Sequence, residues 1–179
     1  MEKRINFNNL KKPYFIAEIG GNHAGKKDLA FKGIINAKKS GADAVKIQTI
    51  NPETITINSN NKDFIVKKGL WKGQNLFKIY KKASLNKISI KKAYEYAKNI
   101  KIKLFSSIFD ISDIDFLEKL NNPIYKIASP EIVDLELIKN VAKCNKPTII
   151  STGMASKQDI KDAVNTFKKY NNKLILLHC

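Results

Sequence analysis

The sequence predicts an α/β fold in which a parallel sheet is covered by helices and curls into a (β/α)8 TIM-type barrel. Short apolar runs alternate with segments of helical spacing along nearly the whole chain. Polar residues follow most of these runs, at the expected carboxyl ends of strands. In a barrel those ends meet at one mouth, whereas in the alternative, an open doubly wound sheet, they spread along a line. About six of the eight strands of a barrel are present, so we expect a fragment or a barrel completed by another segment.

Length and composition are those of one globular domain. The chain has 179 residues, of which 43% are hydrophobic and 27% are charged. We divide it into a polar leader over residues 1–12 and a barrel domain over residues 13–179. No apolar run approaches the length of a membrane span, and the first residues lack the apolar core of a secretory signal. We therefore expect no membrane partner and a cytoplasmic location.

The formal net charge of +17 indicates an anionic partner. Nucleic acid is one candidate, but Arg4 is the only arginine among 33 basic residues. Base readout and bidentate phosphate binding favour arginine. We expect no nucleic-acid partner, and we regard the lysines as mostly solvated residues that help to attract a small anion. The two cysteines, Cys144 and Cys179, belong to no paired motif and suggest neither a disulfide framework nor a zinc site.

Six apolar runs are predicted to be strands. They cover residues 14–19, 43–49, 102–107, 124–128, 147–150 and 174–177. In the second run Lys46 and Gln48 alternate with apolar residues and therefore share one face. The fourth run holds Lys126 between apolar neighbours, where a buried ammonium is unfavourable unless it meets an anion. An edge strand with one solvated lysine is the alternative for this run.

Helical spacing predicts the covering helices. They fall at residues 28–40, 75–83, 88–100, 112–120, 133–144 and 156–170. Ser156, with Asp159 three positions later, predicts a capped start for the last of them. The connection over residues 50–73 is long and contains an alternating stretch at 54–58. It also carries Trp71, the only tryptophan, which we expect to pack within an ordered loop, with stacking on the substrate as the alternative.

Two lysines and several hydroxyls around one mouth predict an anion site. Lys46 and Lys126 supply charge, and serine hydroxyls supply directed hydrogen bonds. These serines are Ser106, Ser107, Ser129 and Ser151. A ligand that carries both a phosphate and a carboxylate would use both lysines.

Two carboxylates near the same mouth, Glu18 and Glu131, could act as acid or base or orient a sugar hydroxyl. A structural role stays open for Glu18, and turn capping stays open for Ser129 and Ser151. His178 is expected to be packed or hydrogen-bonded rather than metal-bound, because His23, the only other histidine, lies on a different turn.

Five motifs, in their order and spacing, resemble the sialic acid synthase family. They are YFIAEIGGNHAG, GADAVKIQT, YKIASPE, KPTIISTGMAS and LLHC. The likeness runs from about Pro13 to the end of the chain. Within the family, the stretch NPETITINSNNKDFIVKKGLWKGQNLFKIYKKA and the pair Ser106-Ser107 resemble the pseudaminic acid synthase branch.

The resemblance implies a condensation of phosphoenolpyruvate with the open-chain aldehyde of an acetamido sugar, which gives a nine-carbon sialic acid and phosphate. It implies that Glu18 is the catalytic residue that handles protons, and that Gln48 and Glu131 contact the sugar. The residues implied to hold phosphoenolpyruvate are Lys46, Ser107, Lys126, Ser129 and Ser151. The favoured sugar is the pseudaminic acid precursor, with N-acetylneuraminate or legionaminate synthesis as alternatives.

The resemblance also implies a divalent metal, Mn²⁺ or Mg²⁺, that polarises the aldehyde. The family's two metal-holding histidines come from strands beyond the point where this chain ends, so we expect the metal ligands to be missing here. The family's carboxy-terminal antifreeze-like domain, which adds an arginine across a dimer interface, is also missing, so we expect a homodimer only at full length. Ile108 replaces the family's proline after the third strand. We expect little or no synthase activity from this chain alone.

Other functions stay open from the residues alone. One is a non-catalytic anion- or sugar-binding fragment. Another is a Schiff-base aldolase with Lys126 or Lys46 as nucleophile. The third, nucleic-acid binding, predicts affinity that falls steeply with salt.

Overall fold

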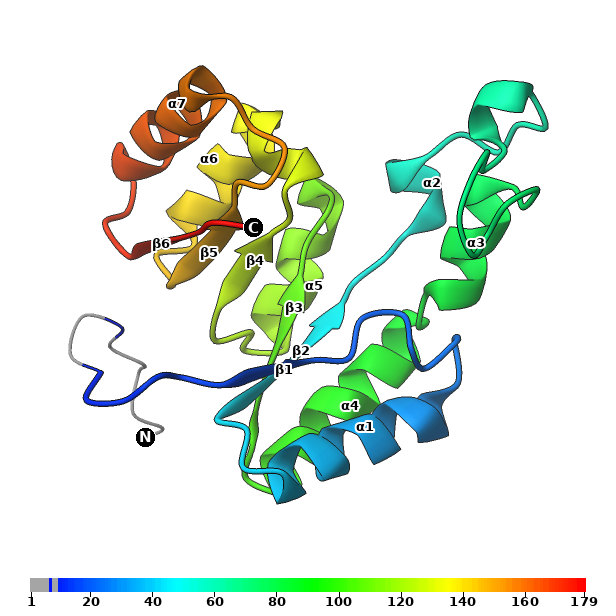
Figure 1. The fold of residues 1–179 in the computed structure, drawn as a ribbon. Coiled ribbons are helices and arrows are strands. Elements are labelled where there is room, and N and C mark those ends of the chain that lie inside the picture. Colours follow the sequence, from blue (N-terminus) through cyan, green and yellow to red (C-terminus); the bar gives the residue numbers. More distant parts are fainter. Residues whose placement is uncertain (1–6, 8–9) are drawn as a thin grey trace.

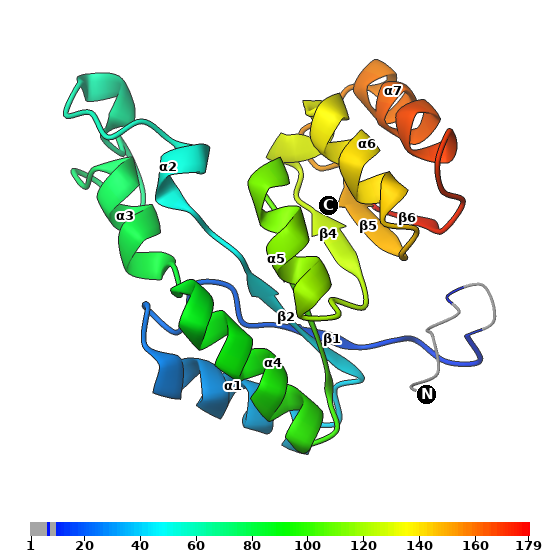
Figure 2. The ribbon, with the colours of Figure 1, turned by 180° about the vertical axis from the view of Figure 1, so that it is seen from behind.

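A computed structural model describes residue 7 and residues 10–179 of the chain. Within this part, six parallel strands form one sheet whose order follows the sequence. The strands are β1 (Ile16–Glu18), β2 (Ala44–Gln48), β3 (Lys103–Ser107), β4 (Tyr125–Ile127), β5 (Thr148–Ser151) and β6 (Leu174–Leu177). The sheet curls, as Figures 1 and 2 show from opposite sides. The predicted partial (β/α)8 barrel is thereby confirmed.

Helices connect the strands, and most of them cover the outer side of the sheet, whereas the two in the long connection after β2 extend away from it. They are α1 (Lys27–Lys39), α2 (Pro52–Ile55), α3 (Leu76–Ala83), α4 (Lys87–Asn99), α5 (Ile114–Lys119), α6 (Leu135–Lys143) and α7 (Lys157–Lys168). Three short 3₁₀ turns join them, namely η2 (Lys62–Phe64), η3 (Ile111–Asp113) and η4 (Pro130–Val133). In Figures 1 and 2, α1 and α4 lie side by side, and α6 lies beside α7. The helix α7 begins with the predicted capping box, in which Ser156 and Asp159 satisfy each other's backbone amides.

The long connection after β2 differs from its expected form. Residues 54–58 do not continue an alternating stretch, because Asn51 and Pro52 start a helical turn there, with the Asn51 side chain accepting a hydrogen bond from the amide of Glu53. An antiparallel bridge between Ile65 and Asn75 then closes the loop before α3. The prediction that Trp71 packs within this loop is wrong, since 54% of the residue is exposed.

Residues on the two faces of the sheet alternate along each strand. Val45 and Ile47 point outward and belong to a core with the helices. The alternate residues point inward, and at the amino-terminal end of the sheet they form an apolar layer of Ala44, Phe105, Ile124 and Ile149. Phe7 and Tyr14 pack against this layer from below. Apart from Phe7 and residues 10–12, the predicted leader lies outside the described residues.

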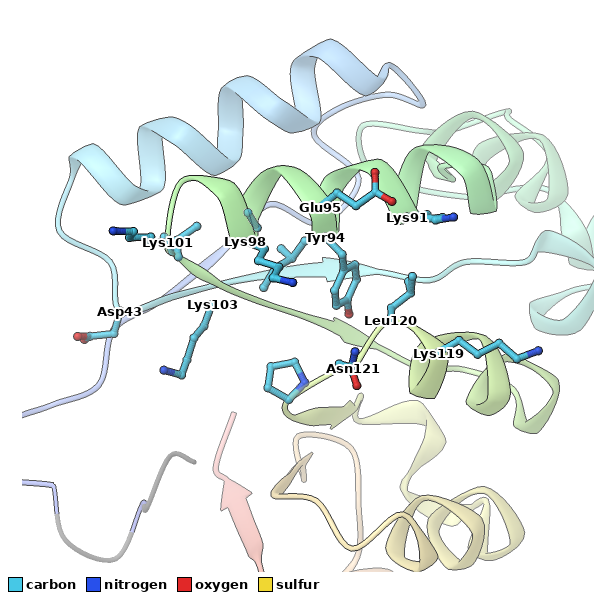
Figure 3. A pocket seen from close by; sticks show the side chains of 14 residues that line it. Asp43, Lys91, Tyr94, Glu95, Lys98, Lys101, Lys103, Lys119, Leu120 and Asn121 are labelled. Atoms are coloured by element: carbon cyan, nitrogen blue, oxygen red, sulfur yellow. The ribbon is translucent and has the colours of Figure 1, made fainter. Parts of the chain in front are cut away.

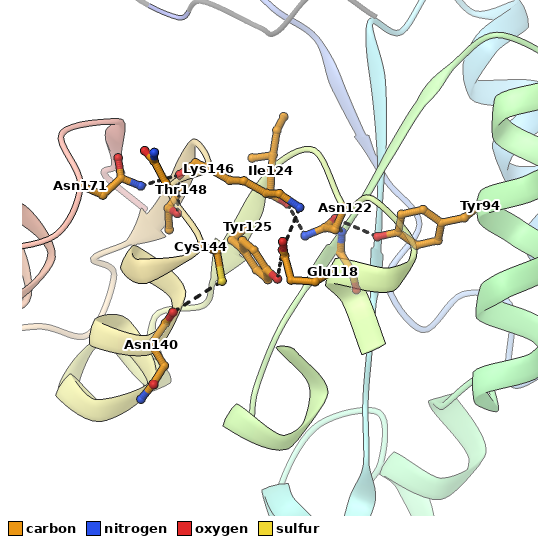
Figure 4. Close-up of polar contacts among 12 residues, drawn as sticks. Tyr94, Glu118, Asn122, Ile124, Tyr125, Asn140, Cys144, Lys146, Thr148 and Asn171 are labelled. Carbon is orange, nitrogen blue, oxygen red and sulfur yellow. Dashed lines mark hydrogen bonds and ion pairs between the residues drawn. The ribbon is translucent and has the colours of Figure 1, made fainter. Parts of the chain in front are cut away.

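A hydrogen-bonded network fixes the outer side of β4 between the helices (Figure 4). The buried hydroxyl of Tyr125 donates to Glu118 Oε1 at 2.7 Å, and Lys146 Nζ lies 2.8 Å from the same oxygen. Burial, followed by the hydrogen bond to Glu118, raises the pKa of Tyr125 above its ordinary value. The tyrosine therefore stays neutral and holds β4 against α5, which in turn fixes the inward direction of Lys126. None of the described helices is long and apolar enough to cross a membrane.

Candidate functional site

The alternation of the strands places polar side chains directly above the apolar layer. Two residues beyond Ala44, Phe105, Ile124 and Ile149 come Lys46, Ser107, Lys126 and Ser151. Because the period of a strand is two, each of these residues points to the inside of the curled sheet. The carboxyl ends of β1 to β5 thus bring together the residues that the sequence predicted as an anion site.

Lys46 stands at the β1 side of this cluster. Glu18 is its register partner on β1, and the two side chains form an ion pair. The ammonium of Lys46 also donates to Ser107 Oγ on β3, at 3.0 Å. The Lys46 side chain is 13% exposed and that of Glu18 is 43% exposed, so the pair opens toward the mouth. Lys46 is therefore held by one partner on each neighbouring strand.

Lys126 stands at the β5 side and is more deeply buried, with 7% of the residue exposed. Its ammonium donates to Ser151 Oγ at 2.7 Å and to the carbonyl of Ile127 at 2.6 Å. No carboxylate among the described residues forms an ion pair with it. Burial lowers the pKa of Lys126 to about 8, and the charge of Lys46 lowers it as well. The positive charges of Lys46 and Lys126 therefore repel each other at the mouth of the sheet.

The turns after β4 and β5 meet beside Lys126. Ser129 Oγ accepts a hydrogen bond from the amide of Gly153 at 3.1 Å, so its hydroxyl proton can be donated elsewhere. Of the pair Ser106-Ser107, only Ser107 belongs to this cluster. Ser106 points outward and makes a 2.8 Å hydrogen bond with Thr49. Ser107, Ser129 and Ser151 thus lie at or just after the carboxyl ends of β3, β4 and β5, and their role in binding an anion stays a prediction.

Glu131, in the turn η4 after β4, carries a buried carboxylate oxygen. No described residue forms a hydrogen bond with Oε2 of this side chain. Burial raises the pKa of Glu131 above its ordinary value, while the nearby charge of Lys126 opposes that rise. A buried oxygen without a partner is an acceptor for a ligand group.

Gln48 lies near Glu18 at the open end of β2. A side chain added at Gly20 would come 3.3 Å from Glu18 Oε1 and 3.8 Å from Gln48 Nε2. Gly20 also has a φ of +55°, so both its conformation and its surroundings favour glycine. The turn that begins with Gly20 buries His23, whose Nδ1 accepts from the amide of Gly25 at 3.1 Å. Burial lowers the pKa of His23, which is therefore a neutral residue of the turn.

A large groove among the described residues lies elsewhere (Figure 3). It has a volume of about 730 Å³ and runs between α4 and the turn that leads into β4, at the amino ends of β3 and β4. Its basic residues are Lys91, Lys98, Lys101, Lys103 and Lys119. None of the predicted site residues lines it. Chemistry, rather than hollow volume, therefore marks the candidate site.

The described residues contain no group of three or more histidine, cysteine, aspartate or glutamate side chains that could hold a metal. The described residues instead gather two ammonium groups and three serine hydroxyls at the carboxyl ends of the strands. The fold and this cluster define a β/α-barrel protein with two inward lysines at the mouth of its sheet.

Comparison with known proteins identifies the family. Residues 33–179 match the model of the NeuB family, and the chain belongs to that family. The pseudaminic acid synthase of Campylobacter jejuni is 43% identical over 175 residues, which are 97% of this chain and 51% of that protein. The Helicobacter pylori pseudaminic acid synthase is 40% identical over 95% of this chain and 50% of its own length. This chain therefore spans about half the length of these relatives.

A solved structure supports both the family and the fold. The N-acetylneuraminic acid synthetase of Leptospira borgpetersenii, crystallised with citrate, aligns with a TM-score of 0.82 and 31% identity. The alignment covers 99% of this chain and 59% of the Leptospira chain. The resemblance to sialic acid synthases expected from the five sequence motifs is thereby confirmed.

Proposed function

We propose that this chain supplies the phosphoenolpyruvate-binding part of a sialic acid synthase. The complete protein would condense phosphoenolpyruvate with an acetamido sugar to give a nine-carbon sialic acid and phosphate. The pseudaminic acid precursor is the favoured sugar, because the Campylobacter and Helicobacter relatives carry that name. Synthesis of N-acetylneuraminate or legionaminate is the alternative, and the name of the Leptospira protein supports the first of these.

One observation carries the proposal, namely the buried ammonium of Lys126. A buried charge without a counter-ion is strongly unfavourable, so a natural sequence retains it where a ligand supplies the opposite charge. No described carboxylate pairs with Lys126, and a second ammonium, Lys46, faces the same space. A small dianion or trianion would offset both the unpaired charge of Lys126 and its repulsion with Lys46.

The two ends of phosphoenolpyruvate suit the two ends of the cluster. We assign the phosphate to Lys126, Ser129 and Ser151, where hydroxyls gather around one ammonium. The carboxylate falls to Lys46 and Ser107. In this orientation the carbon–carbon double bond lies between the lysines and faces the open mouth, from which the sugar aldehyde approaches.

The two glutamate side chains of the site, Glu18 and Glu131, act where the sugar meets phosphoenolpyruvate. Glu18 borders the carboxylate end and is partly exposed, so it can exchange a proton with the condensing intermediate. Glu131 and Gln48 offer an acceptor and an amide to sugar hydroxyls. Fixed charges and dipoles that are already in place stabilise the developing negative charge without reorganisation.

A divalent metal, Mn²⁺ or Mg²⁺, is proposed only for the complete protein. The described residues of this chain do not fit such an ion, and none of the roles assigned above depends on it. A homodimer is likewise a proposal for the complete protein. The chain alone is expected to bind phosphoenolpyruvate without turnover.

Calorimetric titration of the 179-residue chain with phosphoenolpyruvate tests the proposal. We expect binding that weakens about ten-fold or more in Lys126→Met and in Lys46→Met, because each variant removes a charge-assisted contact. Lys139→Met is the matched control, since Lys139 is an exposed lysine of α6 paired only with Glu136. Equal affinity in all four proteins would show that the anion site is misplaced. Release of phosphate with sugar and manganese would contradict the expected inactivity of the chain.

A second candidate, a Schiff-base aldolase, is favoured by one observation. The pKa of Lys126 is lowered to about 8, so a fraction of its amine is neutral near pH 7. Borohydride reduction in the presence of pyruvate would then attach the substrate to Lys126 and add its mass to the protein. Under the synthase proposal we expect no such adduct.

A further inference from the structure

Cys179 follows β6 and lies against the phosphate end of the anion site. The pairing of β5 with β6 sets the backbone position of Cys179. In this pairing Ser151 is the register partner of Leu177, which lies two residues before Cys179. The amide and hydroxyl of Thr152 both donate to the carbonyl of Leu177 at 3.0 Å. The turns after the two strands are thus held together, and Cys179 comes to lie beside Gly153.

The absence of a side chain at Gly153 permits this approach. A Cβ atom built there would lie 3.2 Å from Cys179 Cβ and 3.2 Å from Ser129 Oγ. The Cβ of Cys179 and the hydroxyl of Ser129 therefore both border the space that a side chain at Gly153 would fill. Ser129 in turn accepts from the amide of Gly153.

The charges around the thiol are those of the site. Hydrogen bonding with Ser151 is the main cause that lowers the pKa of Cys179, and Thr152, Ser129 and the charge of Lys126 act in the same direction. The interaction is reciprocal, since the charge of Cys179 is among the groups that raise the pKa of Lys126. The sulfur thus shares its neighbours with the anion that these residues are proposed to bind.

We propose that Cys179 is a further substrate-positioning residue, whose side chain forms the wall of the pocket next to the phosphate of bound phosphoenolpyruvate. This inference rests on the proposed function. It adds Cys179 to a site that the sequence predicts only from lysines and serines at the ends of strands. It predicts that the bound ligand covers the sulfur.

The chain contains its own control, because Cys144 is the only other cysteine. Cys144 lies at the end of α6, donates to the carbonyl of Asn140 at 3.5 Å, and packs against the helix core near Tyr125. Burial raises the pKa of its thiol, which also slows its reaction with electrophiles. Cys144→Ser leaves Cys179 as the only thiol, and Cys179→Ser leaves Cys144 as the only thiol.

The test is the rate of alkylation by iodoacetamide, a neutral reagent, with and without saturating phosphoenolpyruvate. In Cys144→Ser we expect the ligand to slow alkylation about five-fold or more, whereas in Cys179→Ser the rate stays unchanged. Calorimetry on the same samples shows whether the ligand binds, and circular dichroism shows whether each variant is folded. Binding without protection of Cys179 would overturn this inference and leave the anion site intact. Loss of binding in every protein, including the unaltered chain, would overturn both.

A second variant tests the wall directly. In Cys179→Phe we expect affinity for phosphoenolpyruvate to fall about ten-fold or more, because the ring fills the space beside the phosphate. Cys144→Ser, at a residue that packs against the helix core, keeps its affinity within about two-fold. A Cys179→Phe protein that is folded and binds as well as the unaltered chain would refute the assignment.

Discussion

The ammonium of Lys126 on β4 lies 2.7 Å from the hydroxyl of Ser151 on β5, and both groups are buried. The contact fixes a charge at the carboxyl end of the sheet without neutralising it. A hydroxyl offers the ammonium a dipole and leaves the full positive charge for a ligand. The fold thus maintains an unfavourable arrangement that binding would relieve, as expected of a functional site.

The buried charge of Lys126 should make the free energy of unfolding depend on pH. The pKa of folded Lys126 is about 8, below the ordinary value of 10.5, so the folded state binds fewer protons than the unfolded state between these values. The contribution of Lys126 to the free energy of unfolding therefore increases as pH rises through that window. Relative to Lys126→Met, the unaltered chain should recover at most about 3 kcal/mol between pH 7 and pH 10.5. Urea unfolding of both proteins across this range measures the difference, and Lys139→Met should show no such change.

Glu18 competes with the ligand for Lys46. In Glu18→Gln the ion pair is lost while the size of the side chain is kept, so Lys46 becomes fully available to an anion. We expect phosphoenolpyruvate to bind about five-fold more tightly, which corresponds to about 1 kcal/mol for a partly exposed pair. Calorimetry measures it, with Glu136→Gln in the exposed pair on α6 as control. Weaker binding in Glu18→Gln would mean that Glu18 contacts the ligand as a donor.

Gly153 should tolerate no side chain if the turns after β4, β5 and β6 form the phosphate end. Gly153→Ala places a methyl group 3.2 Å from Ser129 Oγ, which must move away. We expect affinity for phosphoenolpyruvate to fall about five-fold or more, as for the loss of a hydrogen bond. Gly41→Ala is the control, because it strains a backbone with φ of +85° in open space far from the site. That variant should lose stability but keep its affinity.

The network on the outer side of β4 should contribute measurably to stability. Glu118→Ala leaves the buried hydroxyl of Tyr125 and the ammonium of Lys146 without their shared acceptor. We expect a loss of about 1–3 kcal/mol in the free energy of unfolding. Glu136→Ala, at an exposed site, should change it by less than about 0.5 kcal/mol. Unfolding in urea distinguishes the two, and an equal small effect would show that the network contributes little.

Much of the site could be predicted because strands have a period of two. Lys46 and Lys126 each stand between outward apolar residues, so their inward direction follows from the pattern alone. The same rule separates Ser107 from Ser106, which the structure turns toward Thr49. Residues after the strands follow no such rule. Ser129 and Glu131 are expected near the mouth because they follow the fourth strand, but the geometry of their turn appears only in the fold.

The predictions failed where a local cap or the course of a loop decides the structure, and they stopped where a long-range contact does. The stretch over residues 54–58 alternates like a strand, but the Asn51 cap and Pro52 favour a helical turn. Trp71 is large and apolar, yet its loop extends beyond the rest of the chain and leaves it half exposed (Figure 1). Cys179 gave no signal as a lone cysteine, since its relation to Ser129 depends on Gly153, a residue 26 positions before it.

A region of low dielectric constant lies directly beneath the two lysines. It is the apolar layer of Ala44, Phe105, Ile124 and Ile149. Counter-ions cannot reach the ammonium groups through this layer, which responds weakly to charge. Ionic screening therefore does not act from that side of the charges. Binding of a small anion at Lys46 and Lys126 should weaken less with added salt than binding at the open groove lined by Lys91 and Lys119. We therefore expect an anion held inside the sheet to tolerate salt better than one held on the outer surface of the same chain.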